Sequence, residues 1–345
     1  MKISIIPDKI KDESYSEKWG KFLKDRGVEV VFVNFSDPFF FEKIQKTNGV
    51  MWRPAHNPDD KQKANRFIYL VDKILQKPIF PNFNTYWHYD DKVAQFFLFK
   101  ALDIPTPKTW LFWNKDMALK WVEKTNYPII HKLAVGASSE NVILLNSISE
   151  AKNQIETDFK GIIPGKKFPI KTLLINKHLK QIIKRFSMSV NYFLRGYFPS
   201  FPEHSWQVEK NYTYFQEFLP NNFFDTRVTV IGKRAFAFRR WNRKDDFRAS
   251  GSGMIDYDSS NIDKEMIRMA FDFSEKGQFQ TMAYDFLYKS NKPVVSEISY
   301  TFQDEAVFRC PGHWDSKMNW HEGHMWPEEA QVEDFIIKLK KIYNS

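Results

Sequence analysis

The segment from 282 to 299 constrains the fold of this 345-residue chain more than any other feature. Met282–Leu287 and Val294–Ser299 are apolar runs of strand-like composition, and Ser290-Asn291 between them has the residues of a turn. Two such runs separated by so short a connection predict an antiparallel hairpin. The chain must therefore contain an antiparallel sheet near its C-terminus.

This hairpin places two acidic residues opposite one another. With residues 290–292 as the loop, Lys289 pairs with Pro293, and Asp285 then lies across from Glu297. The alternation of side chains puts Ser299 on the same face, two residues beyond Glu297. Two carboxylates at paired positions repel each other. The spacing therefore predicts a crowded pair of acids in the middle of the hairpin.

The strands that carry Asp285 and Glu297 are apolar enough to be buried, and burying two like charges is costly unless a cation lies between them. Hard oxygen ligands of this kind suit Mg²⁺ held together with substrate phosphates. The sequence thus predicts a metal site formed by Asp285, Glu297 and Ser299. The alternative is a solvent-facing pair, flanked by Lys289 and Lys292.

The first 88 residues have a different pattern, in which short Val- and Ile-rich strands alternate with helices. We expect strands at 2–7, 28–35 and 49–52, and helices at 14–26 and 59–76. Such alternation predicts a parallel sheet with helical crossovers. Residues 1–88 are therefore expected to form a parallel α/β domain.

From residue 89 onward the chain is expected to be α+β with antiparallel sheets, in two subdomains at 89–218 and 219–345. Within them we predict a helix at 91–102, a strand at 109–113, a helix at 117–124, strands at 127–133 and 141–145, a hairpin at 227–238 and a final helix at 332–343. Gly232-Lys233 suits the turn of that hairpin. Residues of about 159–205 are irregular, basic and aromatic, and are interpreted as an insertion in the first subdomain.

A loop of small residues and a lysine suggest phosphate binding. Gly136-Ala137-Ser138-Ser139 follows a predicted strand, and its backbone N–H groups and hydroxyls could face phosphates. Lys132 ends that strand and could reach the same phosphates as a point charge. The alternative is an ordinary hairpin turn.

Arginines gather on the strands near the predicted metal site. Arg227, Arg239, Arg240 and Arg248 lie within 22 residues of one another, close to Asp225. Such a cluster could neutralise the charge of a transferred phosphoryl group. The alternative is an outward-facing basic strand, because alternation sends only one of Arg239 and Arg240 inward.

These motifs resemble the ATP-grasp superfamily, and especially its carboxylate–amine ligases such as glutathione synthetase and the ligase that adds glutamate to a ribosomal protein. The resemblance runs from about Asp91 to Phe335 and includes the 12-residue spacing from Asp285 to Glu297. It implies a pre-ATP-grasp α/β domain followed by a two-subdomain ATP-grasp fold. It also implies phosphate contacts from Lys92, Lys132, Ser138 and Ser139, adenine contacts from Gln216, Glu217, Phe218 and Leu219, a ribose contact from Asp225, γ-phosphate and acyl contacts from Arg227, Arg240 and Arg248, and metal ligation by Asp285, Glu297 and Ser299.

The activity implied by this resemblance is ATP-dependent formation of an amide from a carboxylate and an amine through an acyl phosphate, with ATP and one or two Mg²⁺ ions, or Mn²⁺. The chain departs from the family at two positions: Ser299 stands where Asn is usual, and the loop has Ser139 and Glu140 where glycine is frequent. Surface-polysaccharide or small-molecule biosynthesis is the context expected for such a ligase. A small-molecule kinase of the same fold and a non-catalytic basic binding protein are the alternatives.

The remaining features bear on partners and compartment. The net charge of +9 would suit a polyanion, but no nucleic-acid motif is present, so we expect small-molecule substrates. No apolar run is long enough for a membrane span, and a single cysteine fits a reducing compartment, so we expect a cytoplasmic protein. The oligomeric state stays open, with a dimer compatible. Cys310, His313, His321 and His324 could bind Zn²⁺, although the surrounding tryptophans favour an aromatic cap.

Overall fold

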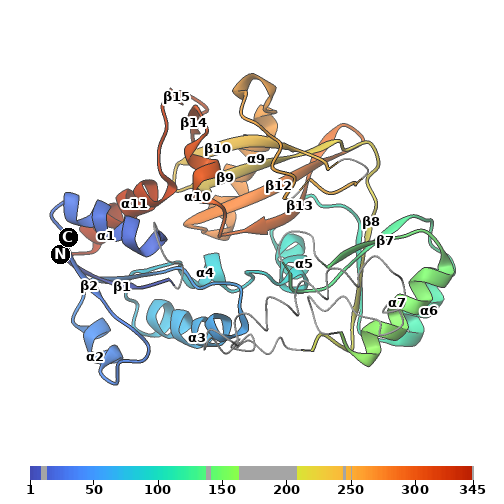
Figure 1. Ribbon diagram of the computed structural model, residues 1–345, viewed down its shortest axis with the longest axis horizontal. Coiled ribbons are helices and arrows are strands. Elements are labelled where there is room, and N and C mark those ends of the chain that lie inside the picture. The colour runs from blue at the N-terminus through green and yellow to red at the C-terminus, as the bar shows by residue number, and fades with distance from the viewer. Residues whose placement is uncertain (9–13, 137–140, 163–207, 244–245, 250, 344–345) are drawn as a thin grey trace, which may run out of the picture.

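The computed structural model describes residues 1–8, 14–136, 141–162, 208–243, 246–249 and 251–343. Within these ranges the chain forms three sheets, one parallel and two antiparallel (Figure 1). Ser138 and Ser139, and most of the expected insertion at 159–205, lie outside the described residues.

The N-terminal sheet is parallel, as predicted. Its strand order is β2-β1-β3-β4, and every adjacent pair is parallel. The strands are β1 (Lys2–Ile6), β2 (Glu29–Phe32), β3 (Gly49–Trp52) and β4 (Ile79–Phe80), and the helices around them are α1 (Tyr15–Asp25), α2 (Phe40–Gln45), α3 (Pro58–Tyr69) with the π-helical turn η1 (Leu70–Ile74), and α4 (Phe83–Tyr86). Ser14 begins α1 by accepting a hydrogen bond from the N–H of Glu17.

The C-terminal helix α11 (Pro327–Tyr343) returns to this first sheet. Phe335 and Leu339 of α11 pack in one hydrophobic cluster with Trp19 of α1 and Ile3 of β1. The two chain ends therefore lie close together, at the left of Figure 1. The helix begins at Pro327, whereas the apolar periodicity predicted a start at 332.

The second sheet is antiparallel, with strand order β5-β8-β6-β7. Its strands are β5 (Thr109–Phe112), β6 (Ile129–Lys132), β7 (Val142–Leu145) and β8 (Thr213–Glu217), accompanied by α5 (Lys92–Ala101), α6 (Lys115–Val122) and α7 (Ile148–Lys160). Helix α7 was not predicted, although Ser147 and Glu150 carry its signature. The Ser147 side chain accepts from the Glu150 N–H, and the Glu150 carboxylate accepts from the Asn146 N–H.

The third and largest sheet has the order β13-β12-β9-β10-β14-β15, with β11 paired to β10. Helix α9 (Lys264–Gly277), also not predicted, packs on this sheet, and one hydrophobic core joins them to the first sheet through Val50, Val228 and Met282. The elements are β9 (Phe224–Ile231), β10 (Arg234–Trp241), β11 (Ile255–Asp256), β12 (Thr281–Lys289), β13 (Lys292–Ser299), β14 (Gly312–Asp315), β15 (Trp320–Glu322), η3 (Ser259–Asn261), α9 and α10 (Asp304–Phe308).

The hairpin β12–β13 pairs Asp285 with Glu297 as predicted, but its turn is shorter than predicted and one strand contains a bulge. The turn has only two residues, Ser290 and Asn291, both with positive φ (49° and 61°), so Lys289 pairs with Lys292. The predicted partner of Lys289, Pro293, was therefore wrong by one residue. A bulge next to Asp285 adds Ser296 to β13 and restores the pairing of Asp285 with Glu297.

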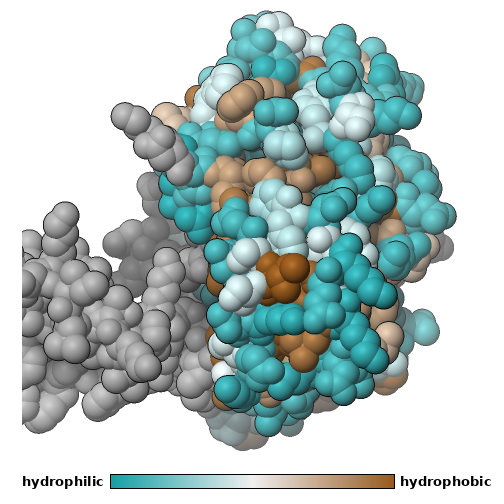
Figure 2. Space-filling view, turned by 90° about the vertical axis from the view of Figure 1, so that its right-hand side faces the viewer, coloured by the Kyte–Doolittle hydropathy of each residue, from teal (hydrophilic) through white to brown (hydrophobic). Residues whose placement is uncertain are grey.

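The architecture as a whole is the predicted one, a parallel α/β sheet followed by two antiparallel sheets. The boundaries at 88 and 218 stay a prediction; one of the three sheets lies in each of the segments that they define. The face at the right of Figure 1 is mainly hydrophilic, with hydrophobic groups in small separate patches (Figure 2). Among the described residues, no helix combines the length and apolar character needed to cross a membrane.

Candidate nucleotide site

A cavity of about 320 Å³ lies between the second and third sheets. Lys132 reaches it from the end of β6, and Asp225, Asp285 and Glu297 reach it from β9, β12 and β13. The cavity gathers most of the residues predicted for a nucleotide site, namely Lys132, Gln216, Glu217, Phe218, Leu219, Asp225, Arg248, Asp285 and Glu297. They come from parts of the chain that are far apart in sequence, so the fold alone brings them together.

Next to this cavity a row of charges crosses three strands; Asp225 and Asp285 of this row line the cavity, whereas the predicted arginines Arg227 and Arg240 do not. Arg227 lies opposite Asp285 and donates from Nε and Nη2 to its two oxygens, at 2.7 and 2.8 Å. Arg240 lies opposite Asp225 and donates from Nε and Nη2 at 2.7 and 2.6 Å. Arg240 also reaches Asp285 Oδ2 at 2.8 Å. Two arginines and two aspartates thus form one nearly buried, charge-balanced network.

This network changes the protonation behaviour of its two acids. Burial opposes the ionisation of Asp285, but Arg227 and Arg240 outweigh it and hold the pKa of Asp285 well below its usual value. Burial and the charge of Asp285 together raise the pKa of Asp225, despite its bond to Arg240. Of the two facing acids, Asp285 therefore has its charge compensated by arginines. The predicted binding of a metal ion by this pair stays a prediction.

Glu297, the partner of Asp285 across the hairpin, is more open. Its side chain is 38% exposed, and its Oε1 lies 3.3 Å from Lys92 Nζ. Lys92 is buried at the start of α5, does not line the cavity, and donates from Nζ to the Gly136 carbonyl at 3.0 Å. The predicted phosphate lysine Lys92 thus connects Glu297 to the beginning of the small-residue loop.

Lys132 is a buried cation that lines the cavity. Burial lowers the pKa of Lys132 to about 8, although Glu297 and Asp285 partly oppose this shift. An anion bound beside Lys132 would raise this pKa again, because a nearby negative charge favours the protonated form of a lysine.

The predicted adenine segment forms another part of the lining. Gln216 is buried and donates to the Thr109 hydroxyl at 3.1 Å, while Glu217 accepts from the Lys108 N–H and pairs with Lys289. The rings of Phe218 and Phe247 meet edge to face at 5.7 Å. The backbone of this segment therefore borders the cavity beside aromatic rings, a suitable environment for a flat heterocycle.

The other two arginines of the cluster have different positions. Arg248 lines the cavity and is bonded to Asp246 through Nε and Nη2. Arg239 lies over the ring of Phe224 at 4.4 Å, so of the pair Arg239 and Arg240 only Arg240 joins the charged row, as strand alternation predicted. The sequence predicted that Arg227, Arg240 and Arg248 surround a phosphate. It did not predict that each of them pairs with an aspartate.

Two of the three predicted metal ligands, Asp285 and Glu297, line the same cavity. Ser299 does not line the cavity, and its hydroxyl donates to the Thr301 carbonyl at 2.7 Å. The described ranges contain no group of three or more His, Cys, Asp or Glu side chains arranged to hold a metal ion. Asp285 and Glu297 nevertheless offer hard oxygen atoms at paired positions, and Mg²⁺ needs only one or two carboxylates when phosphates complete its coordination. Glu297 is 38% exposed, and the Asp285 carboxylate keeps acceptor capacity beyond its contacts with Arg227 and Arg240, so these two residues fit such an ion.

The residues considered for zinc do not converge. The buried Cys310 donates through Sγ to the Ala237 carbonyl, and His324 contacts the carbonyl of Cys310. His313 stacks on His321 across β14 and β15, with ring centroids 5.2 Å apart. The aromatic cap favoured by the sequence therefore describes this region.

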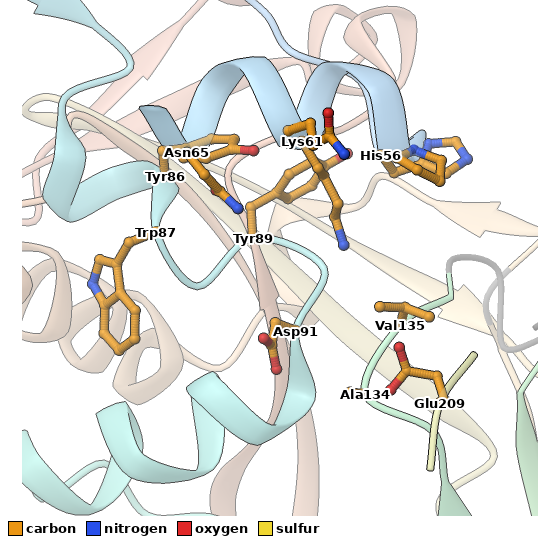
Figure 3. Close-up of a pocket in the computed structure, with 12 residues that line it drawn as sticks. His56, Lys61, Asn65, Tyr86, Trp87, Tyr89, Asp91, Ala134, Val135 and Glu209 are labelled. Atoms are coloured by element: carbon orange, nitrogen blue, oxygen red, sulfur yellow. The ribbon is translucent and has the colours of Figure 1, made fainter. Parts of the chain in front are cut away.

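A second cavity, of about 220 Å³, begins two residues beyond Lys132 along the chain (Figure 3). Ala134 and Val135 line it, facing Lys61 of α3 and the ring of Tyr89. Lys61 donates to the Asp90 carboxylate, and Asp90 also accepts from the Gly136 N–H at 2.9 Å. Sequence reasoning missed this cavity, because its walls come from α3, from residues 86–91 and from the segment after β6, and they carry no motif.

Comparison with known proteins supports the fold. No protein-family model matches the chain, and no curated protein matches it either. Among solved structures, it is similar to a RimK-domain ATP-grasp protein from Sphaerobacter thermophilus (12% identity, TM-score 0.56, covering 98% of this chain and 100% of that one). It is also similar to the D-alanine–D-alanine ligase of Bacillus anthracis complexed with ATP (11%, 0.54, 99% and 99%), and to the ATP-grasp ligase PsnB complexed with a minimal precursor, Mg and ADP (12%, 0.55, 98% and 98%).

These similarities extend over nearly the whole of each chain, while the sequence identity is too low to carry an activity from one protein to another. They agree with the order of one parallel and two antiparallel sheets. The chain therefore has the ATP-grasp fold.

Proposed function

We propose that this protein is an ATP-dependent carboxylate–amine ligase. The observation that carries the proposal is the cavity in which Lys132, from one antiparallel sheet, faces Asp285 and Glu297 from the other. Such a cavity offers a cation for phosphates and carboxylates for a metal ion, in a buried environment where charges act strongly. Two of the similar structures are bound to ATP or ADP, and one of these also to Mg, which supports the same site here.

The nucleotide would lie along the cavity with its base near Phe218 and Phe247 and its phosphates near Lys132. Asp225, next to the base end, would meet the ribose. Bound Mg²⁺, held by Asp285 and Glu297, would neutralise the phosphates and favour transfer of the γ-phosphoryl group.

The chain's own residues supply positioning and positive charge. Arg240 is shared between Asp225 and Asp285, so it is fixed in place before any substrate binds. We infer that Arg240 and Arg227, which lie beside the cavity, stabilise the negative charge that develops during phosphoryl transfer, and that Arg248, which lines the cavity, adds a third cation. Preorganised cations of this kind need little rearrangement during the reaction.

In the proposed reaction a substrate carboxylate oxygen attacks the γ-phosphorus, and the bond to ADP breaks. The amine nitrogen then attacks the acyl carbon, phosphate leaves, and the amine loses a proton. No nucleophilic side chain is needed, because the enzyme orients the reactants and excludes water.

The test is to incubate the protein with ATP, Mg²⁺ and a panel of amino acids, with and without uronic acids or sugar nucleotides. A ligase gives an amide product by mass and releases phosphate only when acid and amine are both present. A phosphorylated alcohol without free phosphate would show a kinase instead. ATP-independent binding of nucleic acid with a steep salt dependence would show a binding protein.

A further inference from the structure

A cavity separate from the nucleotide site lies where the first sheet meets the third. Its volume is about 690 Å³. Arg53 lines it directly after the end of β3, and Asp8 lines it after the end of β1. In open parallel sheets, ligands bind outside the carboxyl ends of the strands. The opposite wall comes from the segment that follows β13, through Phe302, Phe308 and Asp304.

Arg53 has an unusual environment in this cavity. Its guanidinium lies over the Tyr15 ring, 4.3 Å from the centroid, and its Nε atom is buried without a hydrogen-bond partner. A buried donor atom without a hydrogen-bond partner is costly, so an arginine placed in this way is rarely kept for stability alone.

The other charged groups of the cavity wall are already engaged. Lys18 pairs with Asp304 at 2.6 Å, and Arg309 pairs with Glu305. The Asp8 carboxylate accepts from the backbone N–H groups of Tyr15 and Ser16, at the start of α1. Among the described lining residues, Arg53 is therefore the one cation with no ion pair.

We propose that Arg53 binds a carboxylate of the small-molecule substrate. A guanidinium outside any ion pair suits a planar carboxylate, and the rings of Phe302, Phe308 and Trp326, which line the same cavity, provide an apolar wall for the rest of the molecule. The ligand is thus a small organic acid with an apolar or aromatic body. Its role as a substrate rests on the proposed ligase function, whereas binding of the anion at Arg53 does not.

The position of Arg53 indicates what its ligand does in the reaction. Arg53 lines this cavity and not the one that contains Lys132 and Glu297. Tyr300 follows Ser299 at the end of β13 and donates to the carbonyl of Pro54, so the end of β13 connects the two regions. Arg53 is therefore a specificity-determining residue that holds a group of the substrate away from the phosphates.

The experiment compares wild type with Arg53→Met and with the matched control Arg309→Met, which removes a more exposed, ion-paired arginine of the same wall. Phenylacetate is the carboxylate probe, phenylacetamide is its neutral counterpart, and phenyl phosphate tests the other source of an anion. Binding is measured by ligand-observed NMR in the absence of nucleotide, and ATP binding is measured separately by calorimetry.

We expect phenylacetate to bind wild type and Arg309→Met alike, and to bind Arg53→Met roughly tenfold or more weakly, since one charge-assisted contact is lost. Phenylacetamide should bind all three proteins weakly and equally, and ATP affinity should be unchanged. Equal binding of phenylacetate to wild type and Arg53→Met, or none to wild type, would overturn the proposal, and stronger Arg53-dependent binding of phenyl phosphate would overturn the choice of carboxylate. Failure of ATP to bind wild type would refute the ligase function without affecting the Arg53 result.

Discussion

Replacing Lys132 with Met should separate recognition of the phosphates from recognition of adenine. Met keeps an unbranched side chain of similar length and removes the charge that lines the cavity. Loss of one charge-assisted contact weakens binding by about 1.5–3 kcal/mol, or roughly 10- to 150-fold in Kd. Adenosine affinity should stay unchanged, because the proposed adenine segment at 216–219 is not altered.

The pKa of Lys132 adds a second signature to this prediction. Its value of about 8 lies below the ordinary 10.5, so in the free protein the side chain loses its proton as the pH rises through 8. Bound phosphates favour the protonated form. ATP binding near pH 8 should therefore take up about half a proton, and wild-type ATP affinity should fall above that pH. Both effects should be absent in Lys132→Met.

The assay is calorimetric titration with ATP and adenosine, repeated in buffers of different ionisation enthalpy. Lys120→Met, on the exposed side of α6, is the control and should behave as wild type. Equal losses for ATP and adenosine would indicate general damage to the cavity. Unchanged ATP affinity together with unchanged proton uptake in Lys132→Met would refute the assignment of this lysine to the phosphates.

Three further predictions concern the acidic residues Asp285, Glu297 and Glu328. Asp285→Asn should lower the free energy of unfolding by about 3–5 kcal/mol in urea titrations, because it leaves Arg227 and Arg240 under-compensated; an unchanged or higher midpoint would contradict the charged network. Glu297→Gln should leave the unfolding midpoint near that of wild type but weaken the Mg²⁺ dependence of ATP binding, and a Mg²⁺ response equal to that of wild type would remove it from the metal site. Burial raises the pKa of Glu328 from 4.5 to about 8, so wild-type stability should fall as the pH rises between these values, and Glu328→Gln should abolish that slope.

In the hairpin β12–β13, the sequence was enough to predict the facing pair of acids but not the details of the turn and register. The pairing of Asp285 with Glu297 followed from strand alternation, which is a local property. The bulge at Ser296 had no such signal, and the correct pairing resulted from two errors that cancelled, one in the loop length and one in the register. Facing acids alone suggested repulsion. The structure adds what that view lacked, namely Arg227 on the neighbouring strand, which pairs with Asp285.

The sequence did not reveal residues whose surroundings depend on contacts between distant parts of the chain. Arg53 is a single arginine after a short strand, and only the meeting of the first and third sheets places it in a cavity with its Nε atom lacking a hydrogen-bond partner. Helix α7 was missed for another reason, since its capping residues Ser147 and Glu150 were in the sequence and were not used. Local signals can thus be overlooked, whereas long-range charge balance needs the fold.

The central proposal, an amide ligase acting through an acyl phosphate, is tested most directly by isotope transfer. Once the screen identifies an acid, its carboxylate is labelled with oxygen-18 and the phosphate released with ATP and amine is analysed by mass. Attack of the carboxylate on the γ-phosphorus, followed by attack of the amine on the acyl carbon, leaves one labelled oxygen in each phosphate. Unlabelled phosphate, or a stable phosphorylated product in place of an amide, would contradict the proposal.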